Sequence, residues 1–166
     1  MGEKILLKIE DESKSFPSFT AYGRPHGNLY IQRRGPDKGE TSRYDLFFTD
    51  SRIIAAAVVS TYELPPLIMS YGDVKPLREW KKLRDEMRQK FKNSTPDEIL
   101  KMHPESFEIQ YDKIKEIKIL KGVIKAKLDI RITSDGKIEE KMLPIPKRNV
   151  EELKTFIKNY MKQIVV

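Results

Sequence analysis

Two apolar runs on either side of a short polar turn place the strongest constraint on the fold of this chain. The runs are Arg43–Thr49 and Arg52–Ser60. Between them stand Asp50 and Ser51, residue types whose side chains hydrogen-bond their own backbone in turns. Apolar runs rich in β-branched and aromatic residues, separated by such a turn, are typical of a β-hairpin. We therefore expect the chain to build at least part of its core on a sheet.

Further strands are predicted around this hairpin. The clearest is Val123–Thr133, where apolar and charged residues alternate as in a strand with one buried face. Asp135-Gly136, a pair that accepts positive φ in a two-residue hairpin turn, follows it. The sequence predicts seven strands in all, at Lys4–Ile9, Asn28–Arg34, Arg43–Thr49, Arg52–Ser60, Phe107–Leu120, Val123–Thr133 and Lys137–Leu143.

A pair of helices is predicted between Ser60 and Phe107. Val74–Lys92 carries apolar residues at three- and four-residue steps, the spacing of an amphipathic helix. The second helix begins at Thr95 as N-cap, with a proline at the first helical position and Glu98 completing a capping box. Together they form a helical insertion over residues 74–103.

The chain closes with a third predicted helix, at about residues 149–164. Asn149 is its expected N-cap, and Glu152, three residues on, would complete a capping box. Apolar residues recur at helical spacing along it, at Val150, Leu153, Phe156, Ile157, Tyr160, Met161 and Ile164. One face of this helix must therefore be buried.

Length and composition favour a single domain over residues 1–166, because a chain of this size can bury roughly two thirds of its unfolded surface. Cysteine is absent, which excludes disulfides, thiol catalysis and thiolate metal ligands. The first twenty residues lack the apolar segment of a signal peptide, and the longest apolar run, Ile53–Val59, is too short to span a bilayer. We expect a cytoplasmic protein. Its 34% charged residues are typical of proteins from hot environments.

Seven strands without βαβ alternation and a final helix predict a mainly β fold, a small antiparallel sandwich or barrel. Leu46–Ile54 resembles the apolar-x-x-Thr-Asp-x-Arg-apolar hairpin of pleckstrin-homology-like (PH-like) domains, particularly the prokaryotic PH and GRAM-like branch. Phe107–Ile119, with Tyr111-Asp112 ahead of two isoleucines, resembles the next signature of that branch. The resemblance implies a seven-stranded PH-like barrel capped by the C-terminal helix, with the two-helix insertion between strands 4 and 5. It also implies a noncatalytic binding or scaffolding module.

The commonest phosphoinositide motif of that family, basic residues spaced around the first hairpin, is not recognisable here. If Asn28–Arg34 pairs with the next strand, the loop between them holds Arg33, Arg34 and Lys38. Guanidinium groups suit the oxygens of a phosphate. A phosphate site in this loop and a merely solvated charged loop are both consistent with the sequence.

The net charge of +7 favours an anionic partner, and residues 75–92 carry eight basic against three acidic residues. On this predicted helix, Trp80 belongs to the apolar stripe, and basic residues flank it, as in a helix that lies in a membrane interface. The candidate ligand-binding residues of the helix are Trp80, Lys81, Lys82, Arg88 and Lys92. The same stripe would equally suit a helix packed on its own protein, with its basic face in water.

We therefore expect peripheral binding to anionic lipid headgroups, at the inner surface of the membrane, with a protein partner as the rival hypothesis. Nonspecific nucleic-acid binding ranks third, because zinc-finger spacings and ribonucleoprotein motifs are absent. Catalysis is not expected. His26 and His103 stand alone in the sequence, and it contains no phosphate-binding glycine loop or nucleophile elbow. No metal site or cofactor is predicted.

Overall fold

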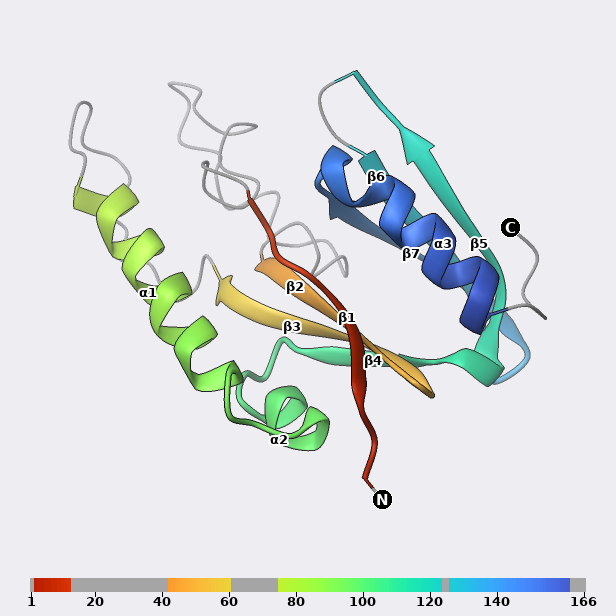
Figure 1. Ribbon diagram of the computed structural model, residues 1–166, viewed down its shortest axis with the longest axis horizontal. Helices are drawn as coiled ribbons and strands as arrows, with labels where there is room; N and C mark the ends of the chain where they lie inside the picture. The colour runs from red at the N-terminus through yellow and green to blue at the C-terminus, as the bar shows by residue number, and fades with distance from the viewer. Residues whose placement is uncertain (1, 13–41, 61–74, 124–125, 162–166) are drawn as a thin grey trace. The chain divides into compact units, whose positions relative to one another are not determined.

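The computed structural model describes residues 2–12, 42–60, 75–123 and 126–161 (Figure 1), and the side chains of 42, 59, 60 and 75–80 are outside this description. The predicted strand Asn28–Arg34 lies outside the described residues. Contacts divide the chain into two compact units. The first combines Met1–Glu12, Asp45–Ala55 and Phe107–Val166, and the second combines Ser13–Tyr44 and Ala56–Ser106.

A four-stranded antiparallel sheet contains the hairpin predicted from the sequence. Its strands, in spatial order, are β1 (Ile5–Ile9), β2 (Ser42–Thr49), β3 (Arg52–Ser60) and β4 (Phe107–Gln110). Every residue of Tyr44–Thr49 and of Ile53–Val58 is buried. Both faces of these two strands are therefore covered, which explains why Leu46–Phe48 and Ile53–Val58 are continuous apolar runs and do not alternate.

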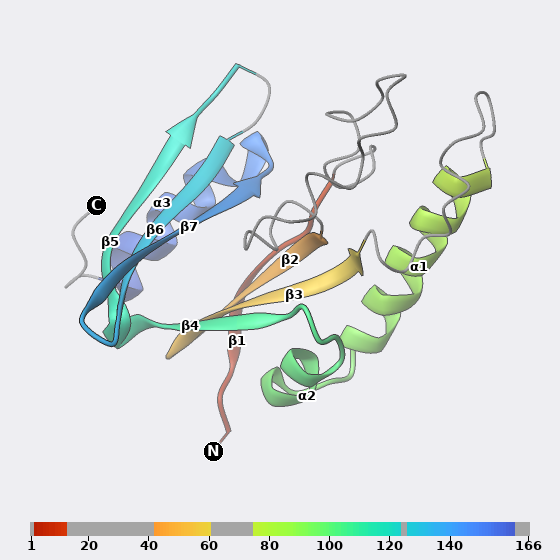
Figure 2. The same cartoon turned by 180° about the vertical axis from the view of Figure 1, so that it is seen from behind.

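A second, three-stranded antiparallel sheet follows, and Figure 2 shows its strands side by side. They are β5 (Ile114–Lys121), β6 (Ala126–Ser134) and β7 (Lys137–Ile145). The predicted turn is confirmed, with φ of 50° at Asp135 and 76° at Gly136. The predicted alternation in β6 holds from Ala126 to Arg131 except at Asp129, which lies on the charged face but is only 7% exposed, and it is lost at Ile132 and Thr133, which are both half-buried.

The prediction of one continuous strand over Phe107–Leu120 is wrong. A 3-10 turn, η6 (Tyr111–Lys113), divides it into β4 and β5 and carries the chain from one sheet to the other. The Tyr111 N–H donates to the Ser51 carbonyl at 3.0 Å, and its hydroxyl donates to the Thr49 carbonyl at 2.7 Å. These bonds hold Tyr111 against the β2–β3 turn and prevent it from continuing the strand.

The closing helix is confirmed as α3 (Val150–Tyr160), preceded by the 3-10 turn η7 (Lys147–Asn149). Its buried face packs within the first unit, where the Phe156 ring meets the Phe48 ring of β2 edge-on at 5.4 Å. The predicted capping box is wrong. Asn149 has helical angles as the last residue of η7, and its side chain makes no cap bond. Its amide Nδ2 instead donates to the Glu152 carboxylate at 3.4 Å.

The second unit contains both inserted helices, α1 (Lys75–Phe91) and α2 (Pro96–Lys101). The capping box at α2 is confirmed: the Glu98 N–H donates to Thr95 Oγ1 at 3.3 Å, and the Thr95 N–H donates to Glu98 Oε2 at 2.9 Å. The Ala57 N–H of β3 donates to Ser106 Oγ at 2.9 Å. This bond ties the end of the helical insertion back to the strand from which it departs.

Candidate functional site

The apolar stripe of α1 is turned away from solvent over its described part. Phe91 is only 3% exposed, and Leu83 and Met87 are half-buried. The side chain of Trp80, which the sequence places on the same stripe, lies outside the described residues. From residue 83 onward, these apolar side chains are not presented as a free surface for a bilayer.

The cationic residues of α1 are distributed unequally between the two sides of the helix. Lys81, Lys82 and Lys92, predicted as ligand-binding residues, are exposed, as is Lys90. Arg88 is half-buried next to the apolar stripe. The exposed lysines can therefore meet an anionic surface without any rearrangement of the helix. The predicted loop residues Arg33, Arg34 and Lys38 lie outside the described residues.

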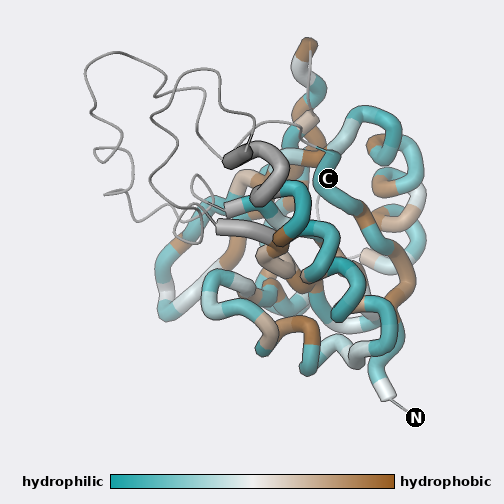
Figure 3. The backbone as a smooth tube through the Cα atoms, turned by 90° about the vertical axis from the view of Figure 1, so that its left-hand side faces the viewer, coloured by the Kyte–Doolittle hydropathy of each residue, from teal (hydrophilic) through white to brown (hydrophobic). Residues whose placement is uncertain are grey.

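Acidic side chains share the exposed side of α1. A shallow hollow there is lined by Lys81, Lys82, Asp85, Glu86 and Gln89. Figure 3 shows the described part of this helix as mostly hydrophilic. Because the acids lie one turn from the first two lysines, the positive field of this face is partly neutralised. The face can attract a diffuse anionic surface and has no purely cationic pocket for a single phosphate.

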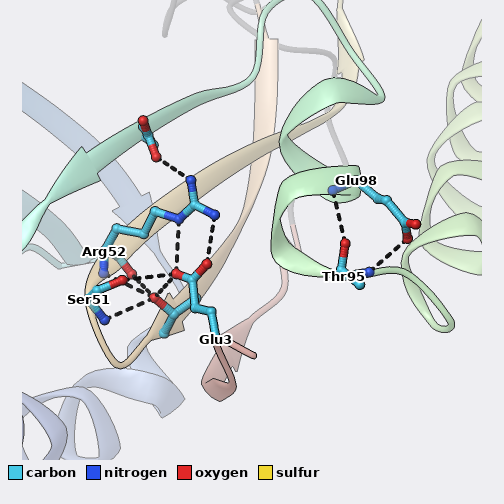
Figure 4. A network of polar contacts seen from close by, with 7 residues as sticks. Glu3, Ser51, Arg52, Thr95 and Glu98 are labelled. Carbon is cyan, nitrogen blue, oxygen red and sulfur yellow. Dashed lines mark hydrogen bonds and ion pairs between the residues drawn. The ribbon is translucent and has the colours of Figure 1, made fainter. Parts of the chain in front are cut away.

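A network of polar contacts surrounds the β2–β3 turn, in the segment that resembles the PH-like hairpin (Figure 4). The guanidinium of Arg52 binds Glu3 in two-pronged fashion, with Nε 2.9 Å from Oε1 and Nη2 2.7 Å from Oε2. Its Nη1 donates to Glu108 at 2.5 Å. The hydroxyl of Thr49 donates to Glu3 and accepts from the N–H groups of Ser51 and Arg52.

The charges and hydrogen bonds of this network stabilise the fold around the turn. The hydrogen bond from Arg52 holds the pKa of Glu3 below its usual value. Burial, reinforced by the negative charges of Asp50 and Glu3, raises the pKa of Tyr111, which stays protonated as a hydrogen-bond donor. Since each of these groups is engaged by its neighbours, the network fixes the N-terminal strand, the turn and the start of the 3-10 segment together.

The sequence predicted the turn at Asp50 and Ser51, but neither the hydrogen bonds of Thr49 nor the two carboxylates that bind Arg52. Glu3 lies 49 residues before Arg52, and Glu108 lies 56 residues after it. Neither has a local motif that would point to the arginine. Because side chains alternate along β4, Glu108 lies on the other face of the strand from the buried Ile109. The sequence could therefore predict that this carboxylate points outward, but not that it binds Arg52.

One of the two histidines, His103, lies in the described part of the chain. His103, predicted at a helix end, lies beyond α2 but is 5% exposed, and its Nδ1 accepts the Glu105 N–H at 3.0 Å. His26 lies outside the described residues. Among the residues that are described, no group of three or more His, Cys, Asp or Glu side chains could hold a metal ion.

None of the helices in the described ranges is long and apolar enough to cross a membrane. Comparison with known proteins finds no matching family model, no matching curated protein and no matching solved structure.

Proposed function

We propose that this chain is a noncatalytic PH-like binding module that associates peripherally with anionic lipid surfaces through α1. The PH-like part of the proposal is supported by the order of elements. A sheet ordered β1 to β4 is followed by a sheet ordered β5 to β7, and a C-terminal helix packs in the same unit. The resemblance of the β2–β3 turn to the family hairpin adds a second line of support.

The observation that carries the lipid proposal is the set of exposed lysines on α1 and directly after it. Lys81, Lys82, Lys90 and Lys92 face solvent, while the apolar stripe beneath them is at least half-buried from residue 83 onward. Such a helix would bind a membrane through the charge of its lysines. The attraction is modest, because Asp85 and Glu86 share the exposed side.

The expected strength follows from these charges. Four lysines less two acids leave two positive charges on the exposed side, and a basic residue near an anionic membrane contributes about 1 kcal/mol. Removing Lys81 and Lys82 together should therefore weaken the free energy of membrane binding by about 2 kcal/mol, which lowers the partition coefficient roughly thirtyfold. High salt should weaken it further, because it screens exposed charges.

Cosedimentation with vesicles tests this proposal. The chain should bind vesicles of phosphatidylcholine mixed with phosphatidylserine at low salt, and should not bind pure phosphatidylcholine. Lys81→Ala/Lys82→Ala should lose most of the binding. The matched control is Lys113→Ala/Lys115→Ala, which removes the same charge from exposed positions on the first unit. Equal loss in both double variants would contradict a role of α1.

The emission of Trp80, the one tryptophan of the chain, separates two modes of lipid binding. Insertion of the helix would shift the emission to the blue on anionic vesicles. The burial of Phe91 favours surface binding, for which no shift is expected. Binding to neutral vesicles with a blue shift would replace the electrostatic proposal by a hydrophobic one.

Protein interaction is the second candidate, and the outer face of the β5–β7 sheet favours it. Leu120, Ile138 and Met142 are 41%, 66% and 48% exposed, and the strand registers place them on one face among charged residues. Exposed apolar side chains rimmed by charges are typical of protein contacts. If a protein partner is the ligand, Ile138→Glu should change the mass of the complex in solution and leave vesicle binding unchanged.

A further inference from the structure

The strand β7 is the edge of the three-stranded sheet in the described part of the chain. It pairs with β6 along its whole length, from Ser134 opposite Lys137 to Ala126 opposite Ile145. No described strand pairs with its other side, where Figure 2 shows β7 at the end of the row. The residues over the first half of β7 are exposed, including Ile138 at 66%.

The turn determines which backbone groups of β7 point outward. A two-residue turn at Asp135-Gly136 makes Ser134 and Lys137 the hydrogen-bonded pair that closes the hairpin. From there the backbone alternates, so Lys137 and every second residue after it bond to β6. The residues between them, Ile138, Glu140, Met142 and Pro144, direct their backbone groups to the free edge.

The proline supports this assignment. Pro144 lacks an N–H and shares the outward register of the free edge, which is where a strand tolerates proline. Within the described ranges, no strand pairs with the outward N–H and C=O groups of Ile138, Glu140 and Met142. An extended partner can therefore add to β7 by antiparallel pairing over this segment.

The segment Ile138–Met142 is self-complementary about its central residue, Glu140. Antiparallel pairing of two copies, centred on Glu140, places Ile138 of each copy opposite Met142 of the other on the outer face. On the inner face it places Glu139 opposite Lys141, again twice. Opposite charges and apolar pairs in directly opposed positions stabilise strand pairing, and like charges weaken it.

The two neighbouring registers of the same strand fail this test. A shift of the second copy by two residues, so that the pairing is centred on Lys141, places Lys141 opposite Lys141. The opposite shift, centred on Glu139, places Glu139 opposite Glu139 and Lys137 opposite Lys141. Of these three registers, only the one centred on Glu140 pairs opposite charges, and its like-charge contact is Glu140 against itself. Each Glu140 lies opposite Arg131 of β6, which places a positive charge beside each carboxylate.

Lys141, which would pair with Glu139 of a second copy, contacts an aromatic ring in its own chain. Its Nζ lies 5.4 Å from the centroid of the Phe107 ring, and the residue is half-buried. This contact keeps the ammonium on the inner face, the face on which Glu139 of a second copy would lie. Glu139 itself is exposed.

We propose that the chain forms a two-fold dimer in which the β7 strands of two copies pair antiparallel about Glu140 and join the two three-stranded sheets. The partner is the chain itself, since its own strand in reverse supplies a lysine opposite Glu139 and a glutamate opposite Lys141. The dimer gives the protein-interaction candidate a specific partner and is independent of the lipid proposal.

Sedimentation equilibrium of the full chain tests the dimer. The wild type should have twice the monomer mass of 19.4 kDa. Glu139→Lys and Lys141→Glu each put two like-charge pairs in the interface and should weaken the dimer by roughly tenfold or more. The double variant Glu139→Lys/Lys141→Glu restores both opposite-charge pairs and should dimerise like the wild type.

An equimolar mixture of the two single variants gives the sharpest result. Two lysines of one copy then meet two glutamates of the other, so a heterodimer should form, visible by native mass spectrometry, where each variant alone is monomeric. Glu140→Pro removes an outward N–H and should abolish dimerisation while the circular dichroism spectrum is retained. Its matched control, Glu140→Ala, keeps the N–H and should remain dimeric.

Two results would overturn the proposal: a wild type that is monomeric across the accessible concentration range, or a dimer that neither charge variant weakens. Both are independent of vesicle binding, which the α1 variants decide separately.

Discussion

Replacing Arg52 by alanine should be the most damaging single change to the polar network at the β2–β3 turn. The guanidinium makes two hydrogen bonds to Glu3 and one to Glu108, and its side chain is only 13% exposed. Truncation leaves the Glu3 carboxylate without its main counter-charge. The network that joins β1 to the turn then loses its centre.

The magnitude follows from the exposure of the two carboxylates. Glu3 is 21% exposed, and its two bonds to Arg52 are at good distances. A hydrogen bond to a charged group in such a setting contributes about 1.5–3 kcal/mol. Glu108 is 34% exposed, so its pair with Arg52 contributes about 1 kcal/mol or less. Arg52→Ala should therefore lower the free energy of unfolding by about 3 kcal/mol.

Urea denaturation at neutral pH measures this loss. The matched control is Arg148→Ala, because Arg148 pairs with Glu12 but is 69% exposed, and its loss should cost about 0.5 kcal/mol or less. Arg52→Lys keeps the charge but loses the two-pronged geometry, so an intermediate cost is expected. If Arg52→Ala and Arg148→Ala have the same effect, the network does not stabilise the fold.

The pH dependence gives an independent check through Glu3. Its pKa is lowered from 4.5 in the folded state, chiefly by the hydrogen bond from Arg52. The stabilisation is therefore complete above the unfolded-state pKa and is lost as the pH falls through the lowered folded-state pKa. The stability gap between wild type and Glu3→Gln should be constant near neutrality and close in acid. A gap that does not change on acidification would refute this assignment.

Three smaller predictions concern turns and caps, all measured by urea denaturation. Gly136→Ala should cost about 1–2 kcal/mol, because φ is +76° although a Cβ would meet no atom within 4 Å, whereas Gly2→Ala should be neutral. Tyr111→Phe should cost about 1 kcal/mol by removing the bond to the Thr49 carbonyl, and a neutral result would mean that water replaces it. Thr95→Ala should cost about 1 kcal/mol by removing the α2 cap, and an unchanged midpoint would contradict that cap's role.

Features encoded by neighbouring residues were predictable from the sequence. The β2–β3 hairpin, the Asp135-Gly136 turn and the capping box at Thr95 each depend on residues within a few positions of one another. The alternation of β6 and the helical spacing of α3 likewise predicted most of their buried residues, but Asp129 is buried on the charged face of β6, and Tyr160, predicted on the apolar face of α3, is 55% exposed. In these segments, local propensity and the tertiary fold agree.

Two of the failures occurred where a distant contact decided the local structure, and a third where a neighbouring 3-10 turn did. Phe107–Leu120 alternates like a single strand, but the bonds from Tyr111 to the β2–β3 turn bend it into a 3-10 segment. Asn149 has a favourable cap sequence, but η7 gives it helical angles, which direct its side chain away from the cap position. The two carboxylates of Arg52 could not be identified, because roughly fifty residues separate each of them from the arginine.

The charged residues of β7 can act in two ways, depending on which strand pairs with its free edge. In the sequence, Glu139, Glu140 and Lys141 read as the charges that protect an edge strand from unwanted pairing. Against a foreign strand they do so, because an arbitrary sequence leaves them opposed by apolar or like-charged residues. Against the same strand in reverse, the first and third of them attract each other. The charges of the edge would therefore disfavour pairing with other strands and favour pairing with a second copy. A heterodimer in the mixture of Glu139→Lys and Lys141→Glu chains would demonstrate this selectivity.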